Sequence, residues 1–103
     1  MGRRSREYAA EWRLAMTQND LDRAIHFEQL LMTSLTQIER RVYNLCHIRA
    51  TVTARDIAAA SSPPIRRENV HRTLEALCVY GLVKKVGKQP LGKTFGDVYE
   101  VAK

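Results

Sequence analysis

The sequence predicts a mainly helical α+β protein with a small β-hairpin towards its C-terminus, and three observations lead to this fold class. First, apolar residues recur every three or four positions in several stretches, which is the pattern of amphipathic helices. Second, Gly81 follows the last of these stretches, where a glycine favours the left-handed conformation that ends a helix. Third, residues 82–86 and 98–101 are short runs rich in valine, which are typical of strands.

Composition and charge favour a small globular protein with an anionic partner. The chain has 103 residues, of which 45% are hydrophobic and 27% charged, as expected for one small domain. Residues 1–33 contain five basic and five acidic residues, so the formal net charge of +6 lies in residues 34–103. A localised positive surplus favours nucleic acid ahead of a membrane surface. Charge that serves only solubility is the alternative.

Several other classes of function have little support in the sequence. No apolar run approaches the roughly 18 residues that span a bilayer, and the N-terminus lacks the apolar stretch of a signal peptide. We therefore expect a cytoplasmic, nucleoid-associated protein without a membrane partner. Cys46 and Cys78 fall on apolar helix faces and are expected to be reduced thiols. The three histidines and two cysteines lack metal-ligand spacing, and no catalytic set of residues occurs, so neither metal, cofactor nor enzymatic activity is expected.

Residues 1–33 are predicted to form a basic arm and a helical hairpin. The arginine-rich arm at residues 3–6 either reaches a groove or phosphate of DNA or is simply solvated. Helices are expected over residues 6–16 and 21–32, with Asn19 or Asp20 capping the second. This hairpin precedes a second region, residues 34–103.

The second helix of this hairpin is apolar over more than half of its circumference. Leu21 and Ile25 are expected on one side of it, whereas Phe27 and Leu30 lie off that side. Such a helix must be covered on two faces, one by residues 34–103 and the other by a further partner, for which a second copy of the chain is the candidate. The predicted homodimer contacts are Tyr8, Trp12, Met16, Phe27 and Leu30.

The start of residues 34–103 contains two helix-capping patterns. Thr36 and Glu39 have the spacing of a capping box, which predicts that a helix begins between them. Thr53 is expected to cap a short alanine-rich helix over residues 54–60, with Asp56 favoured near the amide-rich end. Residues 61–64, which include two prolines, form the following turn.

A helix over about residues 65–80 has one apolar and one polar face. Val70, Leu74, Leu77 and Cys78 form the apolar stripe. The opposite side carries Ile65, Glu68, Asn69, Arg72 and Ala76, with Thr73 on its flank. Residues 87–97 contain three glycines, two lysines and a proline, which predicts a mobile cationic loop between two strands.

A polar-faced helix, a glycine stop and a basic strand together resemble the recognition helix and wing of a winged helix-turn-helix domain. The resemblance covers about Leu35 to Lys103 and is to the DNA-binding domains of small prokaryotic or phage transcriptional regulators. It implies a homodimer on double-stranded DNA, with helix 65–80 in the major groove and the wing 87–97 on the backbone. The implied DNA contacts are Arg66, Arg67, Asn69, Arg72, Thr73, Lys84, Lys85, Lys88 and Lys93.

The turn departs from the usual pattern of this family, and a second class of function remains. Two prolines replace the usual short turn, which leaves open whether Arg66 and Arg67 reach bases or only the backbone. Glu68 and Glu75 near the polar face favour the alternative, a winged-helix protein–protein interaction module of a replication or transcription assembly.

Overall fold

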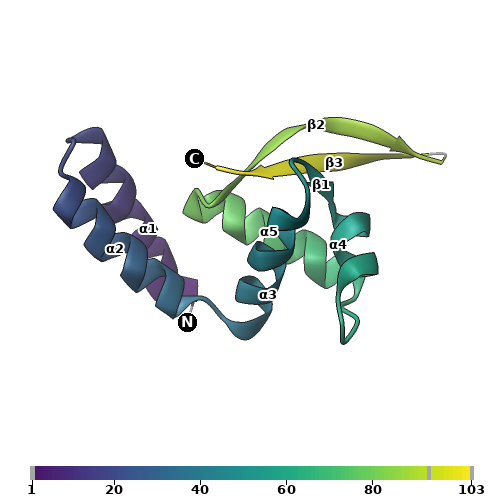
Figure 1. Cartoon of the computed structure of the whole chain (residues 1–103), viewed down its shortest axis with the longest axis horizontal. Helices are drawn as coiled ribbons and strands as arrows, with labels where there is room; N and C mark the ends of the chain where they lie inside the picture. The colour runs from purple at the N-terminus through teal and green to yellow at the C-terminus, as the bar shows by residue number, and fades with distance from the viewer. Residues whose placement is uncertain (1, 93, 103) are drawn as a thin grey trace. The chain divides into compact units, whose positions relative to one another are not determined.

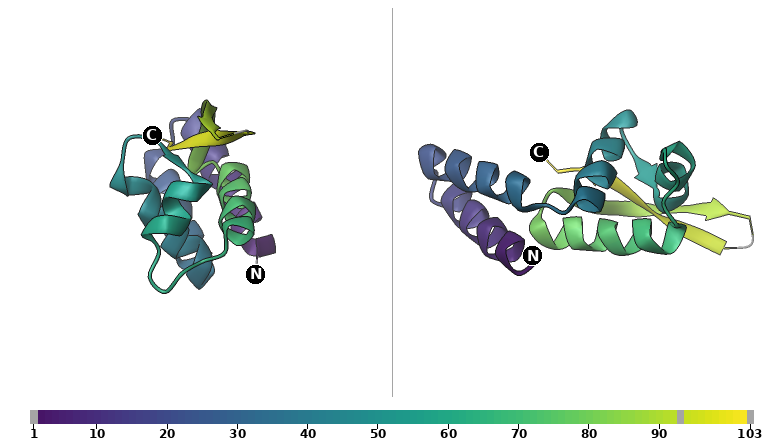
Figure 2. Two further views of the ribbon diagram at one scale, coloured as in Figure 1. Left: turned by 90° about the vertical axis from the view of Figure 1, so that its right-hand side faces the viewer. Right: turned by 90° about the horizontal axis from the view of Figure 1, so that it is seen from below.

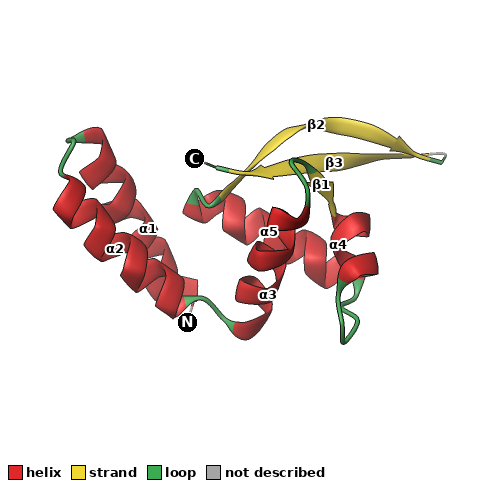
Figure 3. Cartoon of the chain, in the orientation of Figure 1, coloured by secondary structure: helices red, strands yellow, loops and turns green. Residues whose placement is uncertain are grey.

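The protein is mainly helical with one small antiparallel sheet, which confirms the predicted α+β class. A computed structural model describes residues 2–92 and 94–102, and its helices and strands are shown in Figure 1 and Figure 3. The chain divides into two compact units, Met1–Arg40 and Arg41–Lys103. This division lies within a helix, whereas the sequence analysis placed a boundary between residues 33 and 34.

The first unit contains a pair of helices, α1 (Gly2–Thr17) and α2 (Leu21–Ser34). Because α1 begins at Gly2, the prediction of a flexible basic arm before residue 6 is wrong, and the arm is part of the helix. The predicted cap of α2 is confirmed, since the Asp20 carboxylate accepts a hydrogen bond from the Arg23 backbone N–H at 3.3 Å.

Small side chains occupy all of the described buried positions of α1 and α2 except that of Leu31, which is fully buried. Ala9, Ala15 and Ala24 are buried, and small residues of this kind allow two helices to approach closely. The hydroxyls of Ser5 and Ser34 lie 2.7 Å apart and hydrogen bond between the two helices. The pair is therefore fixed by close packing and by a polar contact that satisfies both serines.

Local capping signals set the starts of two helices as predicted. Before α3 (Gln37–Leu45), the Thr36 N–H donates to Glu39 at 2.9 Å and the Glu39 N–H donates to the Thr36 hydroxyl at 3.1 Å. At α4 (Ala54–Ala60), Thr53 and Asp56 form the same reciprocal pair. Ile57, which is fully buried, anchors α4 to the core of the second unit.

The long helix of the second unit is α5 (Arg67–Tyr80), which begins after an N-terminal cap at Arg66. Ile65 therefore precedes the helix, and its burial corrects the prediction that it belongs to the polar face. The apolar stripe is confirmed, since Val70, Leu74 and Leu77 are all fully buried.

Gly81 ends α5 as predicted. Its φ of 83° lies in the left-handed region, which an L-residue with a side chain adopts only with strain. The Gly81 N–H donates to the Cys78 carbonyl and the Leu82 N–H donates to the Leu77 carbonyl, each at 3.0 Å. These two bonds satisfy the last carbonyls of the helix and turn the chain into the first long strand.

Two long strands, β2 (Val83–Leu91) and β3 (Thr94–Val101), form a hairpin that projects beyond the helices of the second unit (Figure 2). The prediction of a mobile loop over residues 87–97 is wrong, because strand pairing continues to Leu91 opposite Thr94. A third strand, β1 (Val52–Thr53), pairs with β3, so the sheet order is β1-β3-β2.

Cys46 and Cys78 are free thiols, as expected from their positions on apolar faces. Burial raises the pKa of the Cys46 thiol to about 12. Among the described residues, none of the helices combines the length and apolar character needed to cross a membrane.

Candidate functional site

The outward face of α5 carries the candidate site. Glu68, Asn69 and Arg72 are exposed on the side of the helix opposite the buried stripe, and Arg67 is exposed at the first position of the helix. Because the stripe faces the core, Glu68, Asn69 and Arg72 point outward by the geometry of the helix. Charged and amide side chains thus cover a continuous stretch of the first two turns of α5.

This face borders an open groove of about 750 Å³ in the second unit. Its other walls are the start of α4 and the outer half of β3. The charged residues that line it are Arg55, Arg67, Arg72, Glu68, Glu75 and Asp97. The groove therefore contains both signs of charge, and the partners of each group decide what it can bind.

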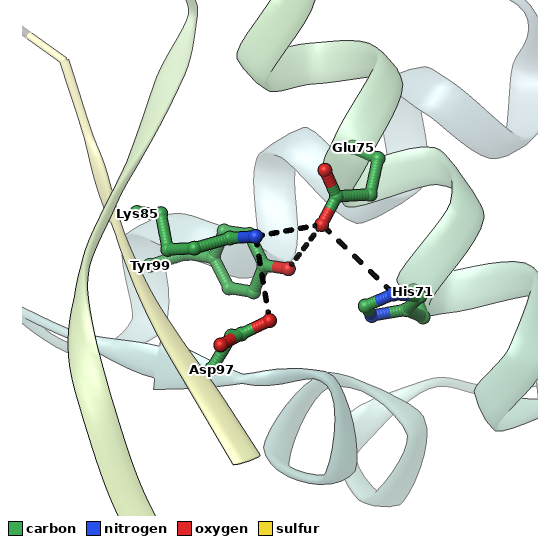
Figure 4. Close-up of polar contacts among 5 residues, drawn as sticks. All are labelled: His71, Glu75, Lys85, Asp97 and Tyr99. Atoms are coloured by element: carbon green, nitrogen blue, oxygen red, sulfur yellow. Dashed lines mark hydrogen bonds and ion pairs between the residues drawn. The ribbon is translucent and has the colours of Figure 1, made fainter.

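A polar network at the inner end of the groove occupies two of its three carboxylates (Figure 4). The Lys85 ammonium lies 3.1 Å from Glu75 Oε1 and 3.4 Å from Asp97 Oδ2. The Tyr99 hydroxyl donates to the same Glu75 oxygen at 3.0 Å, and His71 Nε2 lies 3.9 Å from it. Lys85 therefore offsets negative charge from both α5 and β3.

The network shifts the pKa values of its members in directions that follow from these contacts. The hydrogen bond from Lys85 holds the pKa of the Glu75 carboxyl below its ordinary value, and the same bond raises the pKa of Lys85. Burial, followed by the bond to Glu75, raises the pKa of the Tyr99 hydroxyl well above its ordinary value. At neutral pH the network is an ion pair with a protonated tyrosine.

The arginines of the groove have no such partners. Within residues 2–92 and 94–102, no hydrogen bond or ion pair is formed by the side chains of Arg55, Arg67 or Arg72, and all three are exposed. An unpaired guanidinium keeps its five donors available for a phosphate or a base edge. The carboxylates at the inner end of the groove are thus paired with Lys85, whereas the unpaired arginines make its outer part positively charged.

The structure separates the four lysines of the predicted interface. Lys84 lies 3.1 Å from Glu100, and Lys85 belongs to the network, so both have carboxylate partners. Lys88 is exposed and has no ion pair in the part of the chain that is described. Lys93 lies outside the described residues.

Thr73 does not belong to the exposed face. Its exposed fraction is only 9%, and it is grouped with the buried residues of α5 such as Val70 and Leu74. The expectation that Thr73 is a DNA contact on the flank of the polar face is therefore corrected, because the side chain is largely covered. Arg66, Arg67, Asn69 and Arg72 are all exposed, as a surface contact requires.

The apolar residues of the first unit are exposed to different degrees. Of the predicted dimer contacts, Met16 is exposed, whereas the others are only partly exposed: Tyr8, Trp12, Phe27 and Leu30. Leu21 and Ile25, which were expected on one of the two covered faces of the helix, are each more than half exposed. The centroids of the Tyr8 and Phe27 rings lie 6.5 Å apart, so these two aromatic side chains already pack against each other between α1 and α2.

Among the residues that line the groove, four were not predicted from the sequence: Arg55, Phe95, Asp97 and Tyr99. Phe95, Asp97 and Tyr99 occur at alternate positions of β3, and an alternation of this kind places side chains on one face of a strand. That period-2 signal was present in the sequence, but the neighbouring glycines favoured a loop over residues 87–97, so only Tyr99 was predicted to lie in a strand. Arg55 was missed because it follows a cap and belongs to no apolar pattern.

The described residues contain no group of three or more His, Cys, Asp or Glu side chains that could hold a metal ion. No family model, curated protein sequence or solved structure matches the chain.

Proposed function

We propose that the protein is a winged helix-turn-helix regulator that binds double-stranded DNA in a sequence-specific manner through α5. The observation that carries this proposal is the outward face of α5. Asn69 and Arg72 are exposed on this face, Arg67 is exposed at the start of the helix, and none of the three has a side-chain partner among the residues described. An α-helix fits the major groove of B-DNA, and these side chains would face the base edges.

The chemistry of these side chains suits base recognition. Arginine can donate two parallel bonds to the O6 and N7 atoms of guanine, and asparagine can make a bidentate pair with adenine. Each such pair contributes about 1–3 kcal/mol of discrimination against a wrong base. Arg66 occupies the N-terminal cap position of α5, where its side chain makes no capping hydrogen bond. This place at the end of the helix suits a contact with the DNA backbone that sets the position of the helix.

The pairing of Glu75 supports DNA as the partner. A free carboxylate beside the α5 face would repel phosphate, but Glu75 is held by Lys85 and Tyr99. Asp97 shares the same ammonium. Only Glu68 remains as an exposed acidic side chain of the α5 face without a partner in the described part of the chain, and a glutamate can accept a bond from cytosine.

A homodimer is part of this proposal. Met16, Leu21 and Ile25 are large apolar side chains with more than half of their surface exposed. Leu21 and Ile25 are one helical turn apart on α2 and therefore share a face. Contact between two copies through this face would bury apolar surface and present two α5 helices to two half-sites.

Binding-site selection from random duplexes at two salt concentrations tests the proposal. We expect one enriched sequence and an affinity that falls steeply with salt, because each phosphate contact releases counterions. Arg72→Ala is expected to reduce base discrimination by about 1–3 kcal/mol. Lys88→Ala serves as the matched control and is expected to weaken all duplexes alike. Recovery of no sequence, with no duplex binding at low salt, would refute the proposal.

The dimer is tested separately by sedimentation velocity at micromolar concentration. Ile25→Asp is expected to convert a dimer to a monomer, because it places a charge in the apolar contact. Leu14→Asp is the matched control. Leu14 is an exposed apolar residue of α1 and lies on the side of that helix opposite Met16. A wild-type protein that sediments as a monomer would remove the dimer but not the DNA-binding proposal.

A protein-interaction module is the second candidate. Exposed Glu68 and the exposed Phe95 ring beside the groove favour it, since an acidic group and an aromatic group both suit a protein surface. Weak duplex binding without a salt dependence would favour this candidate over DNA.

A further inference from the structure

Phe95 is an exposed aromatic residue beside the turn of the β2–β3 hairpin. With an exposed fraction of 70%, it is the most exposed of the large hydrophobic side chains described. Single exposed apolar residues are common on protein surfaces and by themselves indicate nothing. Two further features of the hairpin, its continuous strand pairing and the face of β3 that bears Phe95, distinguish this residue from other exposed apolar residues.

The hairpin holds Phe95 at the end of a paired arm. Strand pairing is continuous from Gly87 opposite Val98 to Leu91 opposite Thr94, and Phe95 lies opposite Pro90 within it. The nine residues of β2 extend about 30 Å at about 3.3 Å per residue. At its other end, the arm is fixed to α5 by the Lys85–Glu75 and Tyr99–Glu75 contacts. Phe95 is therefore positioned by strand pairing and is not part of a loose loop.

The face of β3 that bears Phe95 is the one that faces α5. Phe95, Asp97 and Tyr99 alternate along β3, and the Tyr99 hydroxyl reaches Glu75 of α5 from this face. Phe95 accordingly lines the same groove as the unpaired guanidinium groups of Arg67 and Arg72. An aromatic ring thus projects from a wall that stands opposite exposed positive charge.

This combination fits a polyanion that also offers apolar surface, and duplex DNA has both properties. The positive charge of the arginines would attract the polyanion as a whole, whereas the stacked faces of base pairs would accept the phenyl ring. Proteins that insert apolar side chains between base steps in the minor groove kink the duplex by about 20–90°. A hairpin that reaches beyond the helices is suited to the minor groove next to the major groove that α5 would occupy.

We propose that Phe95 is an apolar wedge that enters the minor groove beside the half-site and kinks the DNA there. This inference rests on the proposed function of α5. The hairpin would then contribute to sequence specificity as well as to electrostatic attraction, because the energy of a kink depends on the base step that is deformed. Pyrimidine–purine steps such as TA and CA unstack most easily, so the wedge selects them at a fixed distance from the bases read by α5.

The test uses the full chain and a duplex recovered by selection from a random pool, labelled at both ends for fluorescence energy transfer. Wild-type protein is expected to bend this duplex by about 20–90°. Phe95→Ala is expected to bind it with loss of most of that bend, and Phe95→Leu is expected to retain the bend. Val86→Ala is the matched control, because Val86 is an exposed apolar residue of the same hairpin away from the turn.

A second selection with Phe95→Ala completes the test. The α5-dependent bases are expected to persist, whereas enrichment of the flexible step is lost. An unchanged bend in Phe95→Ala would overturn the wedge and leave DNA binding by α5 intact. A fall in sedimentation mass of Phe95→Ala with no change in bend would also overturn it and assign the ring to a protein contact. If wild-type protein binds no duplex, the proposed function fails first, and the wedge fails with it.

Discussion

The two ends of the β2–β3 hairpin contain the same kinds of residue but differ in what those residues contact. At the base, Lys85 pairs with Glu75 and Asp97, and Tyr99 is fully buried. Towards the tip, Lys88 has no ion pair in the described part of the chain, and Phe95 is exposed. Lys85 and Tyr99 thus stabilise the fold at the base, whereas Lys88 and Phe95 towards the tip are available to contact a partner.

The difference shows how to separate residues that stabilise the protein from residues that bind a partner. Burial of the Tyr99 ring and satisfaction of its hydroxyl contribute to stability whether or not a partner is present. An exposed ring and an unpaired ammonium contribute little to stability, so their effects should appear in binding. Substitutions at the two ends should consequently give opposite results in the two kinds of measurement.

The largest expected effect is on stability at the base of the hairpin. Tyr99→Ala removes a fully buried ring and should lower the free energy of unfolding by about 3–5 kcal/mol, the range for large aromatic truncations. Phe95→Ala should change it by no more than about 0.5 kcal/mol. Urea unfolding followed by far-ultraviolet circular dichroism measures both. Similar losses for the two variants would show that the tip supports the fold and would break the comparison.

A smaller effect is expected from removing only the Tyr99 hydroxyl. Tyr99→Phe loses the hydrogen bond to Glu75 and should cost about 0.5–1.5 kcal/mol at neutral pH. The Tyr99 hydroxyl has a raised pKa in the folded protein, so its contribution is complete below the unfolded pKa of about 10 and is lost as the pH rises above it. The unfolding free energy of wild type should therefore fall above pH 10, and that of Tyr99→Phe should fall less.

The alkaline experiment requires one control in the same unit. The Cys46 thiol, whose pKa is raised to about 12, has the same sign and loses stability from an unfolded pKa of about 8.5 upwards. Burial also raises the pKa of the Cys78 thiol, which acts in the same direction. Measuring both proteins in a Cys46→Ala, Cys78→Ala background removes both contributions. If the unfolding free energy falls equally with rising pH in this background with and without Tyr99→Phe, the loss of stability above pH 10 does not come from the Tyr99 hydroxyl.

Local signals explain which parts of the fold were predictable from the sequence. The start of α4 at Ala54 follows from the capping pair Thr53 and Asp56, and the end of α5 follows from Gly81. In each case the hydrogen bonds that set the boundary join residues at most five positions apart. Energy that arises from such close neighbours is visible in a short window of sequence.

The hairpin and the network were less predictable because their energy comes from distant residues. Glycine and proline between residues 87 and 97 indicated a loop, but β3 gains hydrogen bonds from both β1 and β2. Glu75 and Tyr99 are joined across two different elements, and no local pattern marks that contact. The face of α5 was predictable from its period, whereas the division of its neighbouring lysines into paired and unpaired groups was not.

The next prediction concerns the Lys85–Glu75 ion pair at the base of the β2–β3 hairpin. Lys85→Met should lower the free energy of unfolding at pH 7 by less than about 1 kcal/mol, because the Lys85 and Glu75 side chains are 43% and 44% exposed and solvent screens them. Its pH dependence is more informative. Glu75 has a lowered pKa in wild type, so its contribution is present above the unfolded pKa of about 4.3 and is lost as the pH falls below it.

Without Lys85, that dependence should be weakened or reversed. Glu75 and Asp97 would repel each other, and acid would relieve the repulsion, so stability should fall less or even rise with decreasing pH. Titration of the Glu75 carboxyl by nuclear magnetic resonance in both proteins measures the cause directly. A Glu75 pKa that stays low in Lys85→Met would show that another group holds it, and the base would then not depend on this lysine.

The smallest expected effect concerns two lysines that the sequence could not distinguish. Lys88→Ala should reduce the slope of log affinity for duplex DNA against log salt by about 0.9, the value for one phosphate contact. Lys84→Ala should reduce it less, because Lys84 lies 3.1 Å from Glu100 and that carboxylate offsets its charge. Moving Lys84 to a phosphate would leave Glu100 unpaired near the same polyanion, which opposes the contact. Equal slopes for the two variants would mean that pairing with Glu100 does not reduce the contribution of Lys84 to DNA binding. Pairing within the hairpin would then be no guide to which of its cations bind DNA.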